Sequence, residues 1–396
     1  MSKQQPYILW LPSWYPNQLQ PFDGDFIQRH AYSVSSFHNV HVLFLVRDEK
    51  MLVTKNVKID EKRSNSLIET IVYYAVGNVP MAVQRLISGV HYFRHFKKLI
   101  KCHIKEFGKP ALVHVHVTLK AGIFAKWLHY KYGIPYIISE HWTGLLSEAE
   151  VPFTSLPVYW QQLAKLVWKG AHSISVVSNY LYGHLKKLAP KTSIRVIPNV
   201  VDTTIFNVQP PEQRNAGMNF IHISGFGYQK NFEGILQAFA LLKAKSYDVR
   251  LDVFGPLQPA ILSLIKQLQL SDVVFLYGEV SQAELAIYLK KAAALILYSR
   301  YETFGCVVIE ATACGVPVIA SDIPVLHEIL NEGENGTFVA GENPVALAEK
   351  LAWFIRHRSQ FNAQAIAQHS KELYNYKTVG LQFSQWYAAV LNETRN

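Results

Sequence analysis

The chain has 396 residues, of which 49% are hydrophobic and 17% are charged. Because one hydrophobic core stops growing at roughly 250–300 residues, we expect two domains of about 200 residues each, and the composition excludes a disordered chain. The three cysteines, Cys102, Cys306 and Cys314, are too few and too irregularly spaced for a disulfide framework or a structural metal site. These features predict a globular protein of a reducing compartment, the cytoplasm.

The net charge of +10 is distributed unevenly along the chain. Residues 1–200 contain 24 lysines and arginines against 11 acidic residues, a charge of +13, whereas residues 201–396 contain 15 against 18, a charge of −3. A basic half indicates an anionic partner such as a phospholipid surface, a lipid pyrophosphate or nucleic acid, and a basic surface that merely aids solubility is the alternative. Since no apolar stretch approaches the roughly 18 residues of a membrane span, we expect any membrane contact to be peripheral.

Short runs of β-branched and aromatic residues alternate with longer helical patterns, which is typical of parallel sheets wrapped by helices. The strands expected in the first half are Tyr7 to Leu11, Val40 to Val46, Leu112 to Val117, Tyr136 to Ser139, Ser173 to Val177 and Ile194 to Ile197. Those expected after the Pro210-Pro211 pair are Asn219 to Ile223, Val249 to Phe254, Val273 to Tyr277, Ala294 to Leu297 and Val316 to Ala320. The pattern predicts two successive Rossmann-like sheets joined near residues 200–215, with a ligand cleft at the carboxyl ends of the strands.

The first loop and the first long helical pattern are the earliest candidate features. Gly24 stands between two aspartates in the loop after the first predicted strand, and an ordinary turn is the alternative to a ligand-binding loop there. The segment 84–107 combines apolar residues at helical spacing with Arg94, Lys97, Lys98 and Lys101. This pattern is typical of a helix at a membrane surface and equally of a helix packed on a sheet.

Two histidines follow each other in the alternating run Val113 to Val117, so His114 and His116 share one face of the strand. A pair of histidines suggests a metal, but no carboxylate or cysteine nearby completes a set of ligands. His141 and Trp142 follow the next predicted strand and should face the same cleft. Burial in the core or at the rim is the alternative for each histidine.

The most informative residues lie in the second half. Lys230 follows its first predicted strand and precedes an amphipathic helix, so it can reach a pyrophosphate as a point charge; a surface lysine is the alternative. Glu302 precedes a helix that opens near Gly305, and Glu310 lies inside that helix. Free amides of residues 305–307 can bind phosphate, and the two carboxylates can grip hydroxyls at the two ends of a nucleotide sugar, unless they are solvated or cap the helix.

The run Ser299 to Glu310, with two glutamates separated by seven residues, followed by the helix-ending Gly315-Val316-Pro317-Val318, resembles the family 4 retaining glycosyltransferases of the GT-B fold. The resemblance extends upstream to Glu279 and Val280, where that family seats the base of its nucleotide. It covers nearly all of the second half. The family also places an arginine shortly before the position of Lys230, where this chain has Ser224 and Gly225.

The resemblance implies an acceptor domain at 1–205, a nucleotide-sugar domain at 206–375, and a last helix at 376–396 that caps the second domain or crosses back to the first. It implies sugar transfer with retention of configuration and without a metal or other cofactor. The implied catalytic residues are Glu302, His116 and Lys230. The implied donor-binding residues are Gly24, Lys230, Glu279, Val280, Glu302, Phe304, Gly305, Cys306, Val307 and Glu310, with His141 and Trp142 on the acceptor side.

The implied partners are a nucleotide-sugar donor, a glycan or lipid-linked acceptor and the inner face of an anionic membrane, with no nucleic acid. Two alternatives remain open. A GT-B nucleotide-sugar epimerase needs the same nucleotide site, and a catalytically inactive subunit could use the basic half to bind a partner. The paired glutamates favour a transferase.

Overall fold

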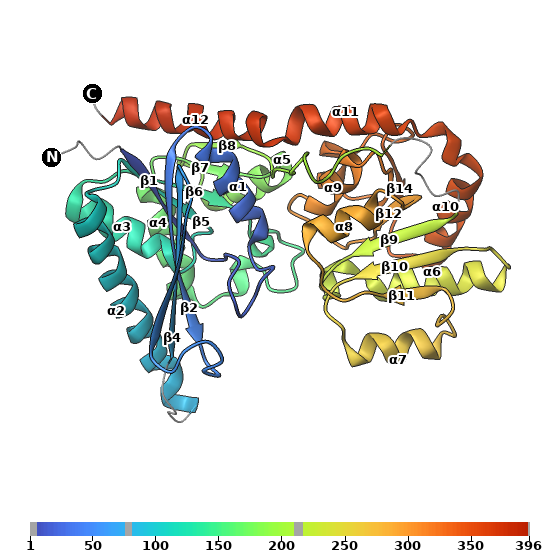
Figure 1. The fold of residues 1–396 in the computed structure, drawn as a ribbon, viewed down its shortest axis with the longest axis horizontal. Coiled ribbons are helices and arrows are strands. Elements are labelled where there is room, and N and C mark those ends of the chain that lie inside the picture. The colour runs from blue at the N-terminus through green and yellow to red at the C-terminus, as the bar shows by residue number, and fades with distance from the viewer. Residues whose placement is uncertain (1–5, 76–80, 210–216, 395–396) are drawn as a thin grey trace.

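The computed structural model describes residues 6–75, 81–209 and 217–394, and for residues 81–88 it describes the backbone alone. It consists of two α/β domains side by side, each built on one sheet (Figure 1). The Pro210-Pro211 pair at the expected junction lies outside the described residues.

The first sheet has eight strands in the order β3-β4-β2-β1-β5-β6-β7-β8. Their bounds are β1 Tyr7–Pro12, β2 Asn39–Asp48, β3 Val57–Arg63, β4 Leu67–Ala75, β5 Leu112–His116, β6 Tyr136–Glu140, β7 Ile174–Val176 and β8 Ile194–Val196. All neighbours are parallel except β3, which pairs antiparallel with β4. The six strands expected from the sequence are present, while β3 and β4 are additions that the sequence pattern did not predict.

The second sheet has six strands, all parallel, in the order β11-β10-β9-β12-β13-β14. Their bounds are β9 Asn219–Ile223, β10 Arg250–Phe254, β11 Val274–Leu276, β12 Ala294–Leu297, β13 Val318–Ser321 and β14 Gly336–Val339. Five match the expected strands to within two residues, and β14 is the unexpected one. This doubly wound order places the carboxyl ends of β9 and β12 next to each other, at the point where a ligand is expected.

Helices cover both faces of each sheet, as parallel strands buried on both faces require. The helices of the first half are α1 Asp25–Ser35, α2 Met81–Phe107, α3 Ala121–Tyr132, α4 Val158–Gly170 and α5 Asn179–Leu188. Those of the second half are α6 Phe232–Ala244, α7 Pro259–Gln267, α8 Gln282–Leu289, α9 Cys306–Ala313, α10 Pro344–His357, α11 Ala363–Tyr374 and α12 Tyr376–Glu393.

The last helix, α12, leaves the second domain and packs on the first beside α1 (Figure 1). Trp386 and Tyr387 are fully buried there, together with Trp10 of β1. The indole Nε1 of Trp386 donates to Ser173 Oγ at 2.7 Å, and the Tyr387 hydroxyl lies 2.7 Å from Nδ1 of His114. The helix therefore supplies part of the core of a domain that is otherwise built from residues far earlier in the chain.

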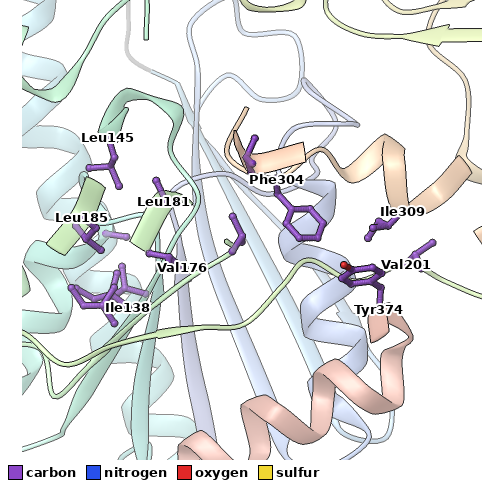
Figure 2. Close-up of a cluster of buried hydrophobic side chains, with 14 of the residues drawn as sticks. Ile138, Leu145, Val176, Leu181, Leu185, Val201, Phe304, Ile309 and Tyr374 are labelled. Carbon is purple, nitrogen blue, oxygen red and sulfur yellow. The ribbon is translucent and has the colours of Figure 1, made fainter. Parts of the chain in front are cut away.

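The two domains also share a hydrophobic cluster, part of which Figure 2 shows. Leu145, Val176 and Leu181 come from the first domain, and Phe304 and Ile309 come from the second. Polar contacts border this cluster: Ser178 Oγ donates to the Thr303 carbonyl at 2.7 Å, and Glu328 accepts from the backbone amides of residues 179 and 180. The cleft between the domains is thus closed along one side.

Helix α2 packs its apolar face on the first sheet, since Phe96 and Ile100 are fully buried against it. The cations Arg94, Lys97, Lys98 and Lys101 are exposed on its other side. Val90 and Phe93 are also exposed, whereas the side chains of Arg85 and Leu86, which belong to the same pattern, lie outside the described residues. The packed-helix alternative therefore accounts for the buried apolar residues, and the basic face is exposed to a partner. Among the described residues, no helix is long and apolar enough to span a bilayer.

Candidate active site

A pocket of about 230 Å³ opens between the two domains. The second domain contributes the loops that follow β9 and β10, the residues Glu279 and Val280, and the start of α9; the first domain contributes Phe22 and two residues of α1, Asp25 and Arg29. The pocket thus lies at the carboxyl ends of the strands, where parallel sheets bind ligands.

The start of α9 forms one wall of the pocket. Gly305 is the N-cap residue with φ of 100°, a left-handed conformation that favours glycine, and Cys306 and Val307 line the pocket behind it. The first amides of a helix have no carbonyl partner inside the helix and carry the positive end of its dipole, so they can bind a phosphate. Burial raises the pKa of Cys306 to about 12, so its thiol is not a nucleophile at neutral pH.

Phe304 lies beside this helix start but points the other way. Its ring is buried in the interdomain cluster, with its centroid 5.8 Å from that of Tyr374 (Figure 2). Only the backbone of Phe304 is therefore available to a donor, and its side chain holds the loop against the core.

Lys230 and Glu302 are joined in a hydrogen-bonded cluster. The Lys230 Nζ lies 2.5 Å from Glu302 Oε1, which also accepts from Ser299 Oγ at 2.8 Å. The other carboxylate oxygen accepts from Gln229 Nε2 at 3.1 Å. Glu302 is almost fully buried, so these bonds fix its carboxylate in one orientation. The sequence predicted both residues for the site, and the structure brings them together.

Glu310 is bonded across the cleft to the first domain. Its Oε1 lies 2.6 Å from the Nη1 of Arg29, and both side chains are only 5% exposed. Burial disfavours the charged guanidinium, but Asp25 and Glu310 outweigh this and hold the pKa of Arg29 above its ordinary value. Burial raises the pKa of Glu310, and Arg29 opposes that shift. A second contact joins the same two domains, because Gln282 Nε2 of α8 donates to Asp25 Oδ2 of α1 at 2.8 Å.

Gly24 explains how α1 comes to face the pocket. It is the N-cap of α1 with φ of 66°, and an added Cβ would lie 2.5 Å from the backbone carbon of Trp14. Only glycine fits this close approach of the loop to the segment after β1. The turn at Gly24 therefore directs Asp25 and Arg29 into the pocket.

His116 and His141 lie on the first domain's side of the cleft, at the ends of two neighbouring strands. Their rings are nearly parallel, with centroids 5.8 Å apart, and His30 of α1 lies beside both. Burial lowers the pKa of all three histidines, that of His30 to about 3, so each is neutral at pH 7. Both ring nitrogens of His116 and of His141, and Nδ1 of His30, are buried with no hydrogen-bond partner among the described residues.

The other expected histidine and tryptophan take structural places. Both ring nitrogens of His114 are hydrogen-bonded, one to the Tyr387 hydroxyl and one to Ser139 Oγ. His114 is therefore a core residue, which was the alternative to a role in the site. The half-buried Trp142 packs over Gly144, where an added Cβ would lie 2.2 Å from the indole. It adjoins His141 at the rim of the cleft.

The sequence analysis missed Arg29, Asp25 and His30 as site residues, although all three follow Gly24 closely. Asp25, Arg29 and His30 lie one, five and six residues after the glycine, and this spacing is the one local signal, since it places Arg29 one helical turn beyond Asp25. The partner of Arg29, however, lies in the other domain, and no local pattern identifies it. The fold also brings His30 and His141 to His116, with one ring nitrogen of each within 4.8 Å of the others, a grouping that the sequence did not predict.

Two parallel sheets that face each other across a cleft, with a helix start aimed into it, define a GT-B fold. Two family models match this chain in succession: Glycosyltransferase Family 4 over residues 25–205 and Glycosyl transferases group 1 over residues 208–372. The chain therefore belongs to the GT-B glycosyltransferases of the group 1 and family 4 type.

Among curated proteins, an uncharacterized glycosyltransferase of Methanocaldococcus jannaschii is 26% identical over 80% of this chain and 84% of its own length. The N-acetyl-alpha-D-glucosaminyl L-malate synthase of Bacillus anthracis is 26% identical over 56% of this chain and 61% of its own. The alpha-monoglucosyldiacylglycerol synthase of Streptococcus pneumoniae is 25% identical over 64% and 61%.

Solved structures share the fold at lower identity. The sucrose-phosphate synthase of Thermosynechococcus elongatus superposes with a TM-score of 0.77 at 18% identity, over 98% of this chain and all of that one. An Anabaena protein, HepE, in complex with UDP and glucose gives 0.72 at 15% identity, over 97% and 100%. At these identities the likeness shows the fold alone.

Proposed function

We propose that this glycosyltransferase moves a sugar from a nucleoside diphosphate sugar to a glycan or lipid-linked acceptor, with retention of configuration and without a metal. The observation that carries the proposal is the interdomain pocket, which is lined by the start of α9 and by the buried Glu310, while the buried Glu302 lies in the loop just before that helix. The names of the relatives are consistent with such acceptors, since one is a synthase of a glucosylated diacylglycerol.

In this proposal the diphosphate lies against the amides of Cys306 and Val307, which stabilise the charge that develops on it. Lys230, held by Glu302, supplies a cation beside it. Arg29 supplies the second cation from the opposite domain, in place of the arginine that the family has shortly before the position of Lys230, where this chain has Ser224 and Gly225. Binding then exchanges the Arg29–Glu310 contact for contacts of Glu310 with ribose and of Arg29 with phosphate.

Glu302 orients the transferred sugar in this mechanism, and His116 contacts the sugar from the first domain. The departing phosphate takes the acceptor proton on the same face, so no protein nucleophile is required. The residues of the site act by positioning and by electrostatic stabilisation. His141 and Trp142 lie where an acceptor can approach from the first domain's side.

The experiment that tests the proposal is a thermal-unfolding panel of UDP, GDP, ADP and their sugars in the presence of EDTA, followed by a transfer assay with the best donor. A ligand at 100 times its Kd stabilises the folded protein by about 2.7 kcal/mol. We expect one nucleotide series to stabilise the protein and turnover to survive EDTA. Activity that is lost in EDTA and restored by Mg²⁺ or Mn²⁺ would contradict metal independence.

The two alternative functions are separated by the same reagents. A nucleotide-sugar epimerase would convert the donor in the absence of any acceptor. An inactive subunit would bind no nucleotide sugar in the panel, or would bind it without turnover whatever acceptor extract is supplied. The bonded Lys230–Glu302 and Arg29–Glu310 pairs favour an active donor site over the inactive subunit.

A further inference from the structure

The three buried histidines on the first domain's side of the cleft form a cluster with the composition of a metal site. One ligand atom from each of His30, His116 and His141 lies within 4.8 Å of the others. The sheet order β1-β5-β6 brings them together: His116 ends β5, His141 follows β6, and His30 lies on the helix that follows β1. The convergence is a property of the fold and not of any local sequence motif.

The cluster leaves an unusual number of polar atoms without partners. Five ring nitrogens are buried and unbonded among the described residues, although buried polar atoms nearly always find a partner. A buried polar atom without a hydrogen bond destabilises the folded state, so a set of five calls for a ligand. A bound ion would satisfy one nitrogen of each ring.

His30 is oriented as a ligand by a contact outside the cluster. Its Nε2 lies 3.3 Å from the carbonyl oxygen of Pro198, which can only accept, so this nitrogen carries the proton. The lone pair is then on Nδ1, which is buried without a hydrogen-bond partner among the described residues. A carbonyl that fixes the tautomer of a histidine in this way is a recurrent feature around metal ligands.

The surroundings favour a particular class of ion. The walls are apolar and aromatic: Trp10 packs on His116, Phe26 on His141 and Phe383 on His30, with centroids 4.1, 5.0 and 5.1 Å apart. Three imidazoles select zinc, cobalt, nickel or copper over magnesium, calcium or manganese.

We propose that His30, His116 and His141 bind one zinc-class divalent ion, with a water as the fourth ligand. Three histidines and a water are an established ligand set for zinc. A consequence that rests on the proposed function is that the ion inhibits transfer, since it occupies the His116 nitrogen assigned to the sugar. Zinc is then a reversible inhibitor of an enzyme that needs no metal.

The site is tested on full-length protein without an affinity tag, stripped of metal with a chelator. Titration with Co²⁺ reports a nitrogen-ligated ion by its visible absorption, and calorimetry with Zn²⁺ gives the number bound. We expect one ion per chain and a binding constant at least about 100-fold weaker in His30→Gln, because loss of a ligand should cost no less than loss of a supporting residue. His38→Gln, which lies just beyond the same helix, is the matched control and should bind as wild type.

His141→Gln is the second variant, and nucleotide affinity confirms that each variant is folded. The proposal would be overturned if wild-type protein bound no stoichiometric ion, or if both cluster variants bound the ion as wild type does. The ring nitrogens would then be assigned to hydrogen bonds with sugar hydroxyls. The inhibition test is independent of the binding test. If the ion binds and turnover of the donor sugar found in the nucleotide panel is unaffected, the metal site stands and the assignment of His116 to the sugar is wrong. The binding readout requires no activity, so failure of the proposed function is distinguishable.

Discussion

The two walls of the cleft hold their polar groups in opposite ways. On the second domain's wall, Glu302 accepts hydrogen bonds from Lys230, Ser299 and Gln229, and Glu310 is paired with Arg29. On the first domain's wall, His116 and His141 have no bonded nitrogen among the described residues. The second wall is organised before any ligand arrives, whereas the first wall depends on a ligand to satisfy it. Four changes of condition or sequence test this contrast.

The largest expected effect is on stability in acid. Burial lowers the pKa of His30, His114, His116 and His141 in the first domain, and that of His222, to about 4, in the second. Below pH about 6.5 the unfolded chain takes up protons that these folded residues refuse, so stability is lost as the pH falls toward the folded-state values. Each histidine costs up to about 1.4 kcal/mol per pH unit. Burial raises the pKa of Glu140, so this residue takes up a proton more readily in the folded state and offsets the loss of stability from one of the four first-domain histidines.

Hydrogen exchange followed by mass spectrometry at pH 6.5 and pH 5 measures this, with rates corrected for intrinsic exchange. The first sheet should lose protection by more than the second sheet, which is the internal control. Equal losses in both sheets would mean that the buried histidines do not control the acid response.

Glu302→Gln should have the next largest effect, and on kcat. The substitution keeps the shape of the side chain but removes the charge that holds Lys230. We expect kcat to fall by about 100-fold, or about 2.7 kcal/mol, with nucleotide affinity little changed. The exposed Glu334 provides a control as Glu334→Gln. A kcat within a factor of three of wild type would remove Glu302 from the catalytic residues.

Arg29→Gln and Glu310→Gln should act on donor affinity. Each loses a contact assigned to the bound nucleotide, and each also leaves a buried partner, so we expect binding weaker by about 10-fold, or 1.4 kcal/mol. Since the two side chains touch, the double variant should lose less than the sum of the single losses. Calorimetry with the nucleotide measures this, with Arg47→Gln, whose partner Glu49 is exposed, as control. Strict additivity would show that the pair does not act as one unit.

The smallest effect per residue is expected at the basic face of α2, which lies away from the cleft (Figure 1). A cation near an anionic bilayer contributes at most about 1 kcal/mol, and salt screens it. We expect binding to anionic vesicles at low salt to weaken when four side chains become Gln. Sugar transfer to a soluble acceptor should not change. The four are Arg94, Lys97, Lys98 and Lys101. The control variant replaces Lys245, Lys266, Lys290 and Lys291 of the second domain. An equal loss of vesicle binding in this control would show that α2 is not the docking face.

The same contrast explains how much the sequence could predict. The second wall was predictable because Lys230 follows one strand, and Glu302, Gly305 and Glu310 follow another strand at the start of one helix, all of which can be recognised locally. Strand β3 was not, because its residues are mostly charged and exposed at the edge of the sheet, where no alternation of buried residues is required. Strand β14 is only four residues long and begins at a glycine.

The first wall was predictable only in part. His116 and His141 each follow a strand, and their position at the cleft could be expected from that. The contribution of His30 depends on the packing of α1 against two strands, and that of Arg29 depends on the orientation of one domain against the other. Both contributions depend on tertiary packing, which the periodicity of hydrophobic residues and the positions of turn residues do not reveal.

The crossing of α12 has a consequence for synthesis on the ribosome. The last strand of the first sheet, β8, ends at Val196, but the helix whose Trp386 and Tyr387 fill its core begins only at Tyr376. Until that helix leaves the exit tunnel, Trp10 and the apolar side of α1 lack their covering, and His114 lacks the tyrosine hydroxyl it bonds. The nascent first domain therefore remains incompletely packed while the entire second domain is translated. During that interval it is the part of the chain that most needs a chaperone.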